Sequence, residues 1–120
     1  MKTHRIRKAA FTLVEIMIVV AIIGLLAAIA IPNFVRARTT AQMNACINNL
    51  RQIDGAVQQW ALETKKDTTA AVAEGDVTPY LKNSITCPSG GTSFADSYTL
   101  TTVAAQPTCQ KQPGTHKLPP

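Results

Sequence analysis

The chain has 120 residues and a formal net charge of +5, with 12 Lys and Arg against 7 Asp and Glu. Four basic residues precede a long apolar run, and the rest of the chain is close to neutral; the four are Lys2, Arg5, Arg7 and Lys8. This distribution excludes an extended basic surface for nucleic acid, and the length allows only one small domain.

The first predicted element is an apolar helix. Residues 16–31 contain no polar side chain, and the run extends over residues 11–35 with few interruptions. Twenty-five helical residues cover about 37 Å, more than the ~30 Å hydrocarbon core of a bilayer. The basic residues in front of the run predict a cytoplasmic N-terminus and a single membrane span. Pro32 removes one backbone donor and predicts a kink rather than an end, because the helical pattern resumes after it.

The single acid in this run, Glu15, needs an explanation, because a carboxylate at bilayer depth is costly and marks a candidate functional residue. A cleaved secretory signal is one interpretation, with a small-x-small cleavage site at Ala28–Ala30. However, the apolar run is longer than the usual 7–15 residues of such a signal. An ordinary membrane anchor is a second interpretation. Neither accounts for Glu15.

Residues 36–66 continue the helix with one apolar face. Apolar side chains recur there every three or four residues, which is the spacing of an amphipathic helix. They are Met43, Cys46, Ile47, Leu50, Ile53, Val57, Trp60 and Ala61. We therefore predict one long helix over residues 11–66, apolar all round at first and amphipathic afterwards.

The remaining residues predict a small cap of mixed structure. Residues 76–83 suit a short helix with a proline in its first turn, and residues 87–91 (CPSGG) form a turn. Residues 97–103 alternate and are rich in Thr, Tyr and Val, which predicts a strand. Residues 111–120 contain three prolines and no pattern, so we expect a flexible tail. The fold class is α+β, a long helix packed on a cap with a short antiparallel β element.

Three cysteines are an odd number for disulfide pairing. Cys87 and Cys109 are each flanked by turn residues and enclose the predicted strand, so we predict a disulfide between them. By the loop-entropy estimate it contributes about 3 kcal/mol to the stability of a small cap. Cys46 lies on the apolar face and is expected to be a buried free thiol. Pairing of Cys46 with either of the other two is the alternative.

No enzyme motif, cofactor or metal site is predicted. The two histidines, His4 and His116, lie near the chain ends and are expected to lie outside any packed site. Zinc ligation by Cys87, Cys109 and His116 is not expected, because no fourth ligand is evident. Asp96 is the last acid, so the carboxylates that calcium sites use near a C-terminus are missing.

The segment RKAAFTLVEIMIVVAIIGLLAAIAIPNF, Arg7–Phe34, resembles the N-terminus of type IV pilins and of type II secretion pseudopilins. The shared features are a basic leader, a small residue at Ala10, the F-T-L-x-E motif, a long apolar helix and Pro32. The resemblance implies that a prepilin peptidase cuts between Ala10 and Phe11 and methylates the new amine of Phe11. The family usually has glycine where this chain has Ala10.

The resemblance also implies a role for Glu15. In this family the carboxylate meets the Phe11 amine of a neighbouring subunit and sets the axial stagger during assembly. Because neither charge is stable alone in an apolar core, the two offset each other when they are paired. Phe11, Glu15 and Pro32 are therefore the implied assembly residues.

The implied function is that of a structural subunit and not an enzyme. The sequence patterns and the resemblance together divide the chain into a leader (residues 1–10), a membrane and filament-core helix (11–35), an amphipathic half (36–66), a cap (67–110) and a tail (111–120). The processed chain is a single-pass inner-membrane protein with a periplasmic C-terminal part. It then enters a homo-oligomeric filament at an assembly platform in the inner membrane.

Three interpretations of the function remain. The short body favours a type II secretion pseudopilin that acts in protein export. The first alternative is a type IV pilin of a surface fibre for adhesion, motility or DNA uptake. The second is a monomeric, signal-anchored periplasmic module that keeps its leader.

Overall fold

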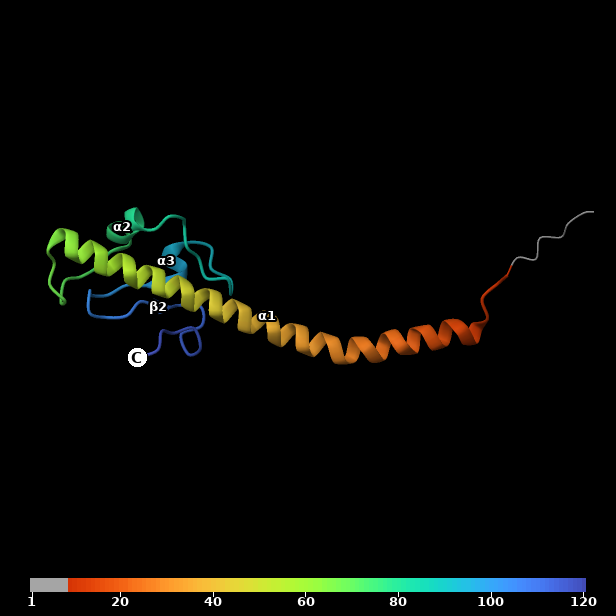
Figure 1. Cartoon of the computed structure of the whole chain (residues 1–120). Helices are drawn as coiled ribbons and strands as arrows, with labels where there is room; N and C mark the ends of the chain where they lie inside the picture. Colours follow the sequence, from red (N-terminus) through yellow and green to blue (C-terminus); the bar gives the residue numbers. More distant parts are fainter. Residues whose placement is uncertain (1–8) are drawn as a thin grey trace, which may run out of the picture. The chain divides into compact units, whose positions relative to one another are not determined.

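The computed structural model describes residues 9–120, and one long helix dominates them (Figure 1). In chain order the elements are α1 (Leu13–Thr64), α2 (Glu74–Val77), η1 (Thr78–Tyr80), α3 (Phe94–Ser97), β1 (Tyr98–Thr99) and β2 (Thr108–Cys109). The predicted fold class, a long N-terminal helix with a small α+β cap, is confirmed. The chain divides into two compact units, with the boundary in the sequence between Ala37 and Arg38. Most of the predicted leader, with His4, lies outside the described residues.

The helix α1 has 52 residues and continues through Pro32. Proline cannot donate to the carbonyl of Ala28, so one backbone bond of the helix is missing there. The kink expected at this point stays a prediction. At its C-terminal end, the backbone N–H of Lys66 donates to the carbonyl of Ala61 over 2.9 Å. Lys65 adopts a left-handed conformation with φ of 53°, as in a Schellman motif.

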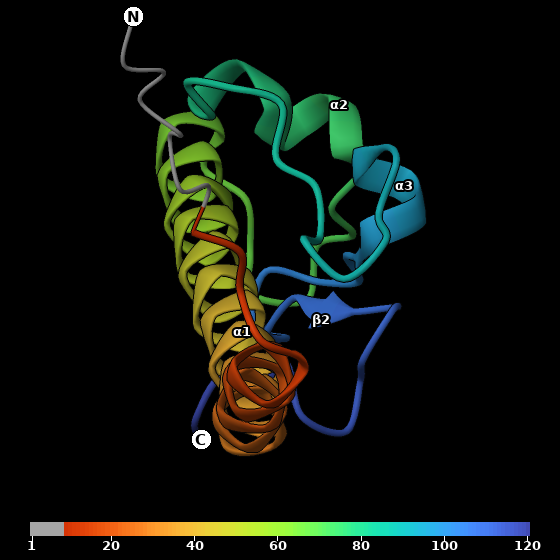
Figure 2. The same cartoon turned by 90° about the vertical axis from the view of Figure 1, so that its right-hand side faces the viewer.

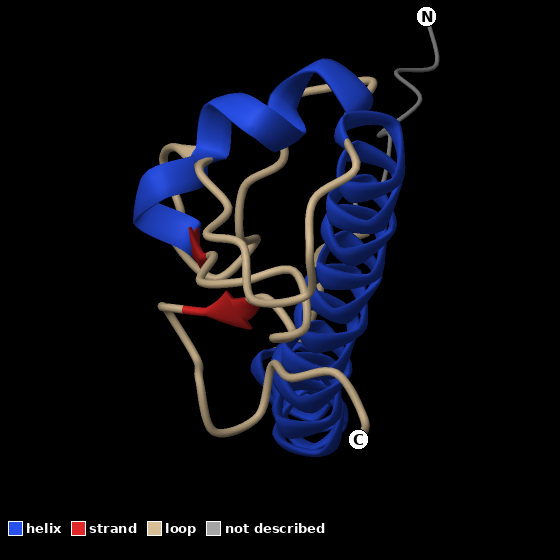
Figure 3. Ribbon diagram, turned by 90° about the vertical axis from the view of Figure 1, so that its left-hand side faces the viewer, coloured by secondary structure: helices blue, strands red, loops and turns tan. Residues whose placement is uncertain are grey.

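The core of the second unit lies along one face of α1. The buried residues of the helix are spaced by one, three or four positions, as the sequence pattern predicts, and are Cys46, Leu50, Ile53, Ala56, Val57, Trp60 and Ala61. They pack against apolar side chains from the cap, which include Val77, Phe94 and Tyr98. Figures 2 and 3 show that loops make up most of the cap and lie beside this half of α1.

The β element is antiparallel, with Tyr98 opposite Cys109 and Thr99 opposite Thr108. The strand predicted over residues 97–103 is therefore correctly located but too long, because β1 contains only Tyr98 and Thr99. Ser97 belongs to α3, because the hydroxyl of Ser93 accepts from the backbone N–H of Asp96 and starts a helical turn. Further along, residue 102 forms only an isolated bridge to residue 71.

The C-terminal residues contact the cap. His116 is buried, and Leu118 packs against the core. The backbone N–H of His116 donates to the carbonyl of Gln112 over 2.9 Å, which forms a turn. The expectation that His116 lies outside any packed site is wrong, because proline-rich segments without periodicity can still be held by a few specific contacts.

Candidate functional site

The most exposed apolar surface of the described residues is the N-terminal part of α1. Its large hydrophobic side chains from Leu13 to Val35 are exposed, and the most apolar window has a mean hydropathy of 2.9 with nothing buried. By length and composition this helix can cross a membrane. Because water is a poor environment for such a surface, lipid or other protein chains must cover it.

Glu15 closes the first turn of α1. Its carboxylate oxygen Oε2 accepts from the backbone N–H of Thr12 over 2.9 Å, and Thr12 Oγ1 accepts from the backbone N–H of Glu15 over 3.3 Å. This reciprocal pair is a capping box, in which Thr12 is the N-cap and Glu15 the third helical residue. Sequence reasoning missed this contact, although the T-x-x-E spacing is its signature.

The other implied processing and assembly residues are accessible. Ala10 and Phe11 precede the helix without regular secondary structure, and Phe11 is 83% exposed. The peptide bond between them is therefore in extended or irregular backbone, the form in which a peptidase can bind it. Pro32 is also exposed, further along the same helix.

A second group of reactive side chains lies inside the cap. Three thiols and one imidazole are all buried, and their sulfur and nitrogen atoms lie within 4.8 Å of one another. We call this group the sulfur–histidine cluster; it consists of Cys46, Cys87, Cys109 and His116. It joins α1, the turn that begins at residue 87, the strand β2 and the C-terminal segment.

The predicted disulfide partners come together without a bond between them. The Sγ atoms of Cys87 and Cys109 lie 3.6 Å apart, and all three cysteines are free thiols in this structure. The disulfide stays a prediction. Cys46 is a buried free thiol on the apolar face, as expected, but it lies beside the other two. No pattern in the sequence predicted that Cys46 and His116 lie beside Cys87 and Cys109.

Burial and local hydrogen bonds together shift the pKa values of three members of the cluster. Burial, together with the hydrogen bond to Cys109, raises the pKa of Cys46 to about 12. Burial would also raise the pKa of Cys109, but backbone N–H groups of Gln112 and Lys111 and the neighbouring thiols outweigh it and lower this pKa. Burial lowers the pKa of His116 and favours the neutral imidazole.

The turn that carries Cys87 is closely packed. The backbone N–H of Cys87 donates to Ser97 Oγ over 3.0 Å, and the N–H of Gly91 donates to the carbonyl of Cys87 over 2.8 Å. A Cβ on Gly91 would lie 2.1 Å from Ser97 Oγ, so only glycine fits at this point. The position of the Cys87 sulfur therefore depends on a glycine three residues beyond Pro88.

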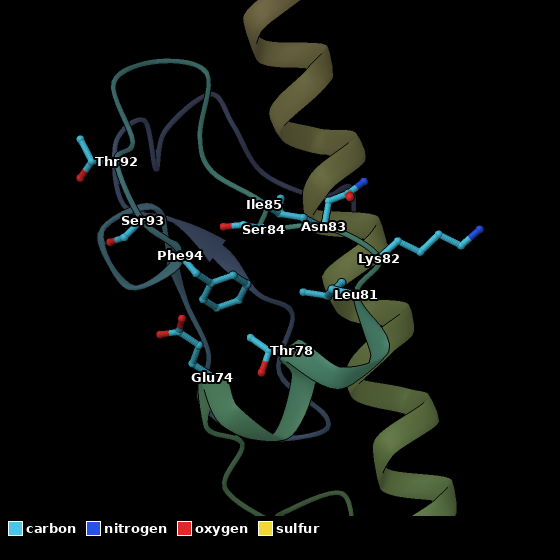
Figure 4. Close-up of a pocket in the computed structure, with 10 residues that line it drawn as sticks. All are labelled: Glu74, Thr78, Leu81, Lys82, Asn83, Ser84, Ile85, Thr92, Ser93 and Phe94. Carbon is cyan, nitrogen blue, oxygen red and sulfur yellow. The ribbon is translucent and has the colours of Figure 1, made fainter.

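A surface cavity of about 430 Å³ lies between α2, η1 and α3, but it lacks convergent polar groups (Figure 4). Its charged side chains are Glu74 and Lys82, and Figure 4 shows them pointing in opposite directions. A binding pocket normally directs several polar groups at one point. This cavity is therefore a weaker candidate than the apolar helix or the sulfur–histidine cluster.

Comparison with known protein families finds one match, over residues 5–31. This segment matches the family model described as the prokaryotic N-terminal methylation motif. The match contains both sides of the Ala10–Phe11 bond and Glu15, and it ends just before Pro32. No solved structure matches the chain.

Several curated proteins resemble the chain. The type IV major pilin protein PilA of Myxococcus xanthus is 51% identical over 47 residues, which are 39% of this chain and 21% of that protein. The type II secretion system core protein G of Klebsiella pneumoniae is 30% identical over 91 residues, or 71% of this chain and 63% of that protein. The fimbrial protein EcpC of Eikenella corrodens is 36% identical over 93 residues, which are 75% of this chain and 61% of that protein. The chain thus covers between about a fifth and just under two thirds of these relatives.

Proposed function

We propose that the chain is a structural subunit of a helical filament, because its N-terminal segment matches the prokaryotic N-terminal methylation motif and it resembles a type IV major pilin and a type II secretion core protein. In this proposal a prepilin peptidase removes residues 1–10 and methylates Phe11. The remaining chain spans the inner membrane once, with its N-terminus in the cytoplasm and the cap in the periplasm. An assembly platform then moves α1 from the membrane into the filament core.

The observation that carries the proposal is the exposed apolar surface of α1 between Leu13 and Val35. A helix that is apolar on all sides is stable in lipid or among copies of itself, and the same surface therefore serves both states. A pure membrane anchor needs the apolar surface but not an acid near its N-terminus. Glu15 is the residue that separates a filament subunit from an anchor.

Glu15 has two separable tasks in this proposal. Within one chain its carboxylate caps the helix through the backbone N–H of Thr12, and losing a cap costs about 0.5–2 kcal/mol. Between chains the same carboxylate neutralises the Phe11 amine of a neighbour. Breaking a buried ion pair costs more, about 3–5 kcal/mol, because one charge is left unpaired.

Three variants separate these tasks. Glu15→Gln keeps a side chain that can cap the helix but removes the charge, Glu15→Ala removes both, and Thr12→Ala removes the capping hydroxyl but keeps the carboxylate. We expect all three chains to insert in the membrane fraction, and only Thr12→Ala to assemble filaments that electron microscopy can detect. Normal filament yield from Glu15→Gln would refute the charge pairing and leave the capping box as the role of this residue.

Processing is tested on the same material. Intact-mass measurement of the membrane-extracted protein should give the mass of residues 11–120 plus one methyl group. The control is Ala10→Gly, which restores the residue that the family usually has and should be processed at least as completely. A native chain that still begins at Met1 would contradict the proposal and support the monomeric, signal-anchored module.

For the kind of filament, we propose the pseudopilus of type II secretion. The alignment with core protein G runs beyond the apolar helix into the cap, and the cap itself is small, with two strands of two residues each. A type IV pilus is the second candidate, favoured by the alignment with EcpC, which extends over a similar length at higher identity.

Deleting the gene for this chain in its host distinguishes the pseudopilus from the type IV pilus. Loss of protein export without loss of surface fibres is expected for a pseudopilin. Loss of fibres from sheared surface material, with export intact, would overturn the pseudopilus and establish the second candidate.

A further inference from the structure

The sulfur–histidine cluster has the composition and size of a metal site. The Nδ1 atom of His116 lies 4.0 Å from the sulfur of Cys87 and 4.0 Å from that of Cys109. The two sulfurs are 3.6 Å apart, and the Cys46 sulfur completes a group within 4.8 Å. In tetrahedral zinc sites, with bonds of about 2.3 Å to sulfur and 2.0–2.1 Å to nitrogen, ligand atoms are about 3.6–3.8 Å apart. The cluster thus needs to contract by no more than about 1 Å.

We propose that the sulfur–histidine cluster is a structural zinc site. Three thiolates and one neutral imidazole are a standard ligand set for structural Zn²⁺, and softer sulfur ligands disfavour Mg²⁺ and Ca²⁺. All four side chains are buried, so no coordination position is open to a substrate. The ion would connect α1 to the three cap segments that carry the other ligands.

The zinc site accounts for more of the observed side chains than a disulfide does. A bond between Cys87 and Cys109 uses two sulfurs and leaves the Cys46 thiol and the His116 imidazole buried beside it. Zinc gives all four groups a partner. It also explains why the C-terminal segment turns back to bury His116. The two states exclude each other in one chain, because they use the same two sulfurs.

Outer hydrogen bonds suit thiolate ligands. The side-chain amide of Asn49 donates to the hydroxyl oxygen of Tyr98 over 3.0 Å and to the carbonyl of Thr86 over 3.1 Å. The Tyr98 oxygen lies 3.8 Å from the Cys46 sulfur, so its own proton is free to point at a thiolate there. Ligand-supporting bonds of this kind are typical of metal sites.

The first measurement is the metal content of the full chain, purified in detergent micelles without chelator. We expect one zinc ion per chain, protection of the three thiols from alkylation, and loss of that protection after chelation. Cobalt added to the reduced, metal-free chain should give the intense visible bands of tetrahedral Co²⁺ and a thiolate charge-transfer band. Zinc added to the same sample should raise the melting temperature of the cap. This readout does not depend on any variant.

Matched variants then test the ligand set. His116→Gln leaves every thiol in place, and Cys46→Ser leaves the possible disulfide partners in place. The control Lys117→Gln changes the exposed neighbour of His116. We expect the first two to lose more than about 100-fold in zinc affinity, since loss of a supporting residue alone costs about 10–100-fold. Lys117→Gln should bind like the unaltered chain. Helical circular dichroism checks that each variant is folded.

Three outcomes would overturn the zinc site. One is native protein without zinc whose non-reduced digest contains a Cys87–Cys109 linked peptide. Another is zinc retained equally by His116→Gln, Cys46→Ser and Lys117→Gln, which shows adventitious metal only. The third is a stoichiometric metal other than zinc. None of these results bears on filament assembly, so this proposal and the proposed function can fail separately.

Discussion

Replacing Gly91 by alanine tests how closely the cap is packed around Cys87. The new Cβ would lie 2.1 Å from Ser97 Oγ and 2.7 Å from the backbone nitrogen of Cys87. The hydroxyl cannot simply move away, because it accepts from the Cys87 N–H and donates to the carbonyl of Ser93 over 2.6 Å. Overpacking typically costs 1–3 kcal/mol, and a buried amide left without its acceptor costs a similar amount. We expect a loss of about 3 kcal/mol in the free energy of unfolding.

Urea unfolding of the full chain in detergent micelles measures this loss. The single tryptophan, Trp60, is 8% exposed and lies in the core, so its fluorescence reports on the cap. The matched control is Gly55→Ala in α1, where the new Cβ meets nothing within 4 Å. It should stabilise the helix by about 0.5–1 kcal/mol. A Gly91→Ala variant within about 0.5 kcal/mol of the unaltered chain would refute the close packing.

The double variant Gly91→Ala/Ser97→Ala sharpens the test. Removing the hydroxyl relieves the shorter contact but leaves the one with the Cys87 backbone. The double variant should therefore lose less stability than the sum of the losses in the two single variants, because the residues are in direct contact. Strict additivity would show that Gly91 and Ser97 act independently and would contradict the structure.

Three further predictions concern α1 and its contacts. Leu50→Ala should cost about 2–5 kcal/mol in the same urea assay, because Leu50 is fully buried and leaves a cavity; a smaller loss would place it outside the core. Lys65→Gly should stabilise the chain by about 0.5–1 kcal/mol, because glycine adopts the left-handed conformation at φ 53° without strain, and destabilisation would contradict this helix end. The hydrogen bond from the Tyr80 hydroxyl to Glu63 raises the pKa of Tyr80, and Glu63→Gln should lower it towards the ordinary value of about 10, as followed by tyrosinate absorbance. Because the folded-state pKa is raised, this contact stabilises the fold below about pH 10 and is lost as the pH rises through the raised value; an unchanged titration in Glu63→Gln would refute the contact.

Local patterns predicted the long helix well. Side chains three or four residues apart share one helix face, and the residues expected on that face, such as Leu50, Ile53 and Trp60, are buried. The strand over residues 97–103 was predicted too long, because the Ser93 cap draws Ser97 into a helical turn. The T-x-x-E pattern of the sequence is the signature of the capping box at Glu15. It was not predicted, because the charge of Glu15 in an apolar run was interpreted only as a sign of function.

The apolar run, the acid at Glu15 and the bond before Phe11 are local features, and the order of residues alone was sufficient to find them. Each of them is recognised from residues that lie within a few positions of it along the chain. The meeting of Cys46, Cys87, Cys109 and His116 is different, because these residues are far apart along the chain. Their contact depends on the path that the loops take over one face of α1 and on the close packing at Gly91. Only the folded cap therefore shows that the three cysteines and His116 form a single candidate site.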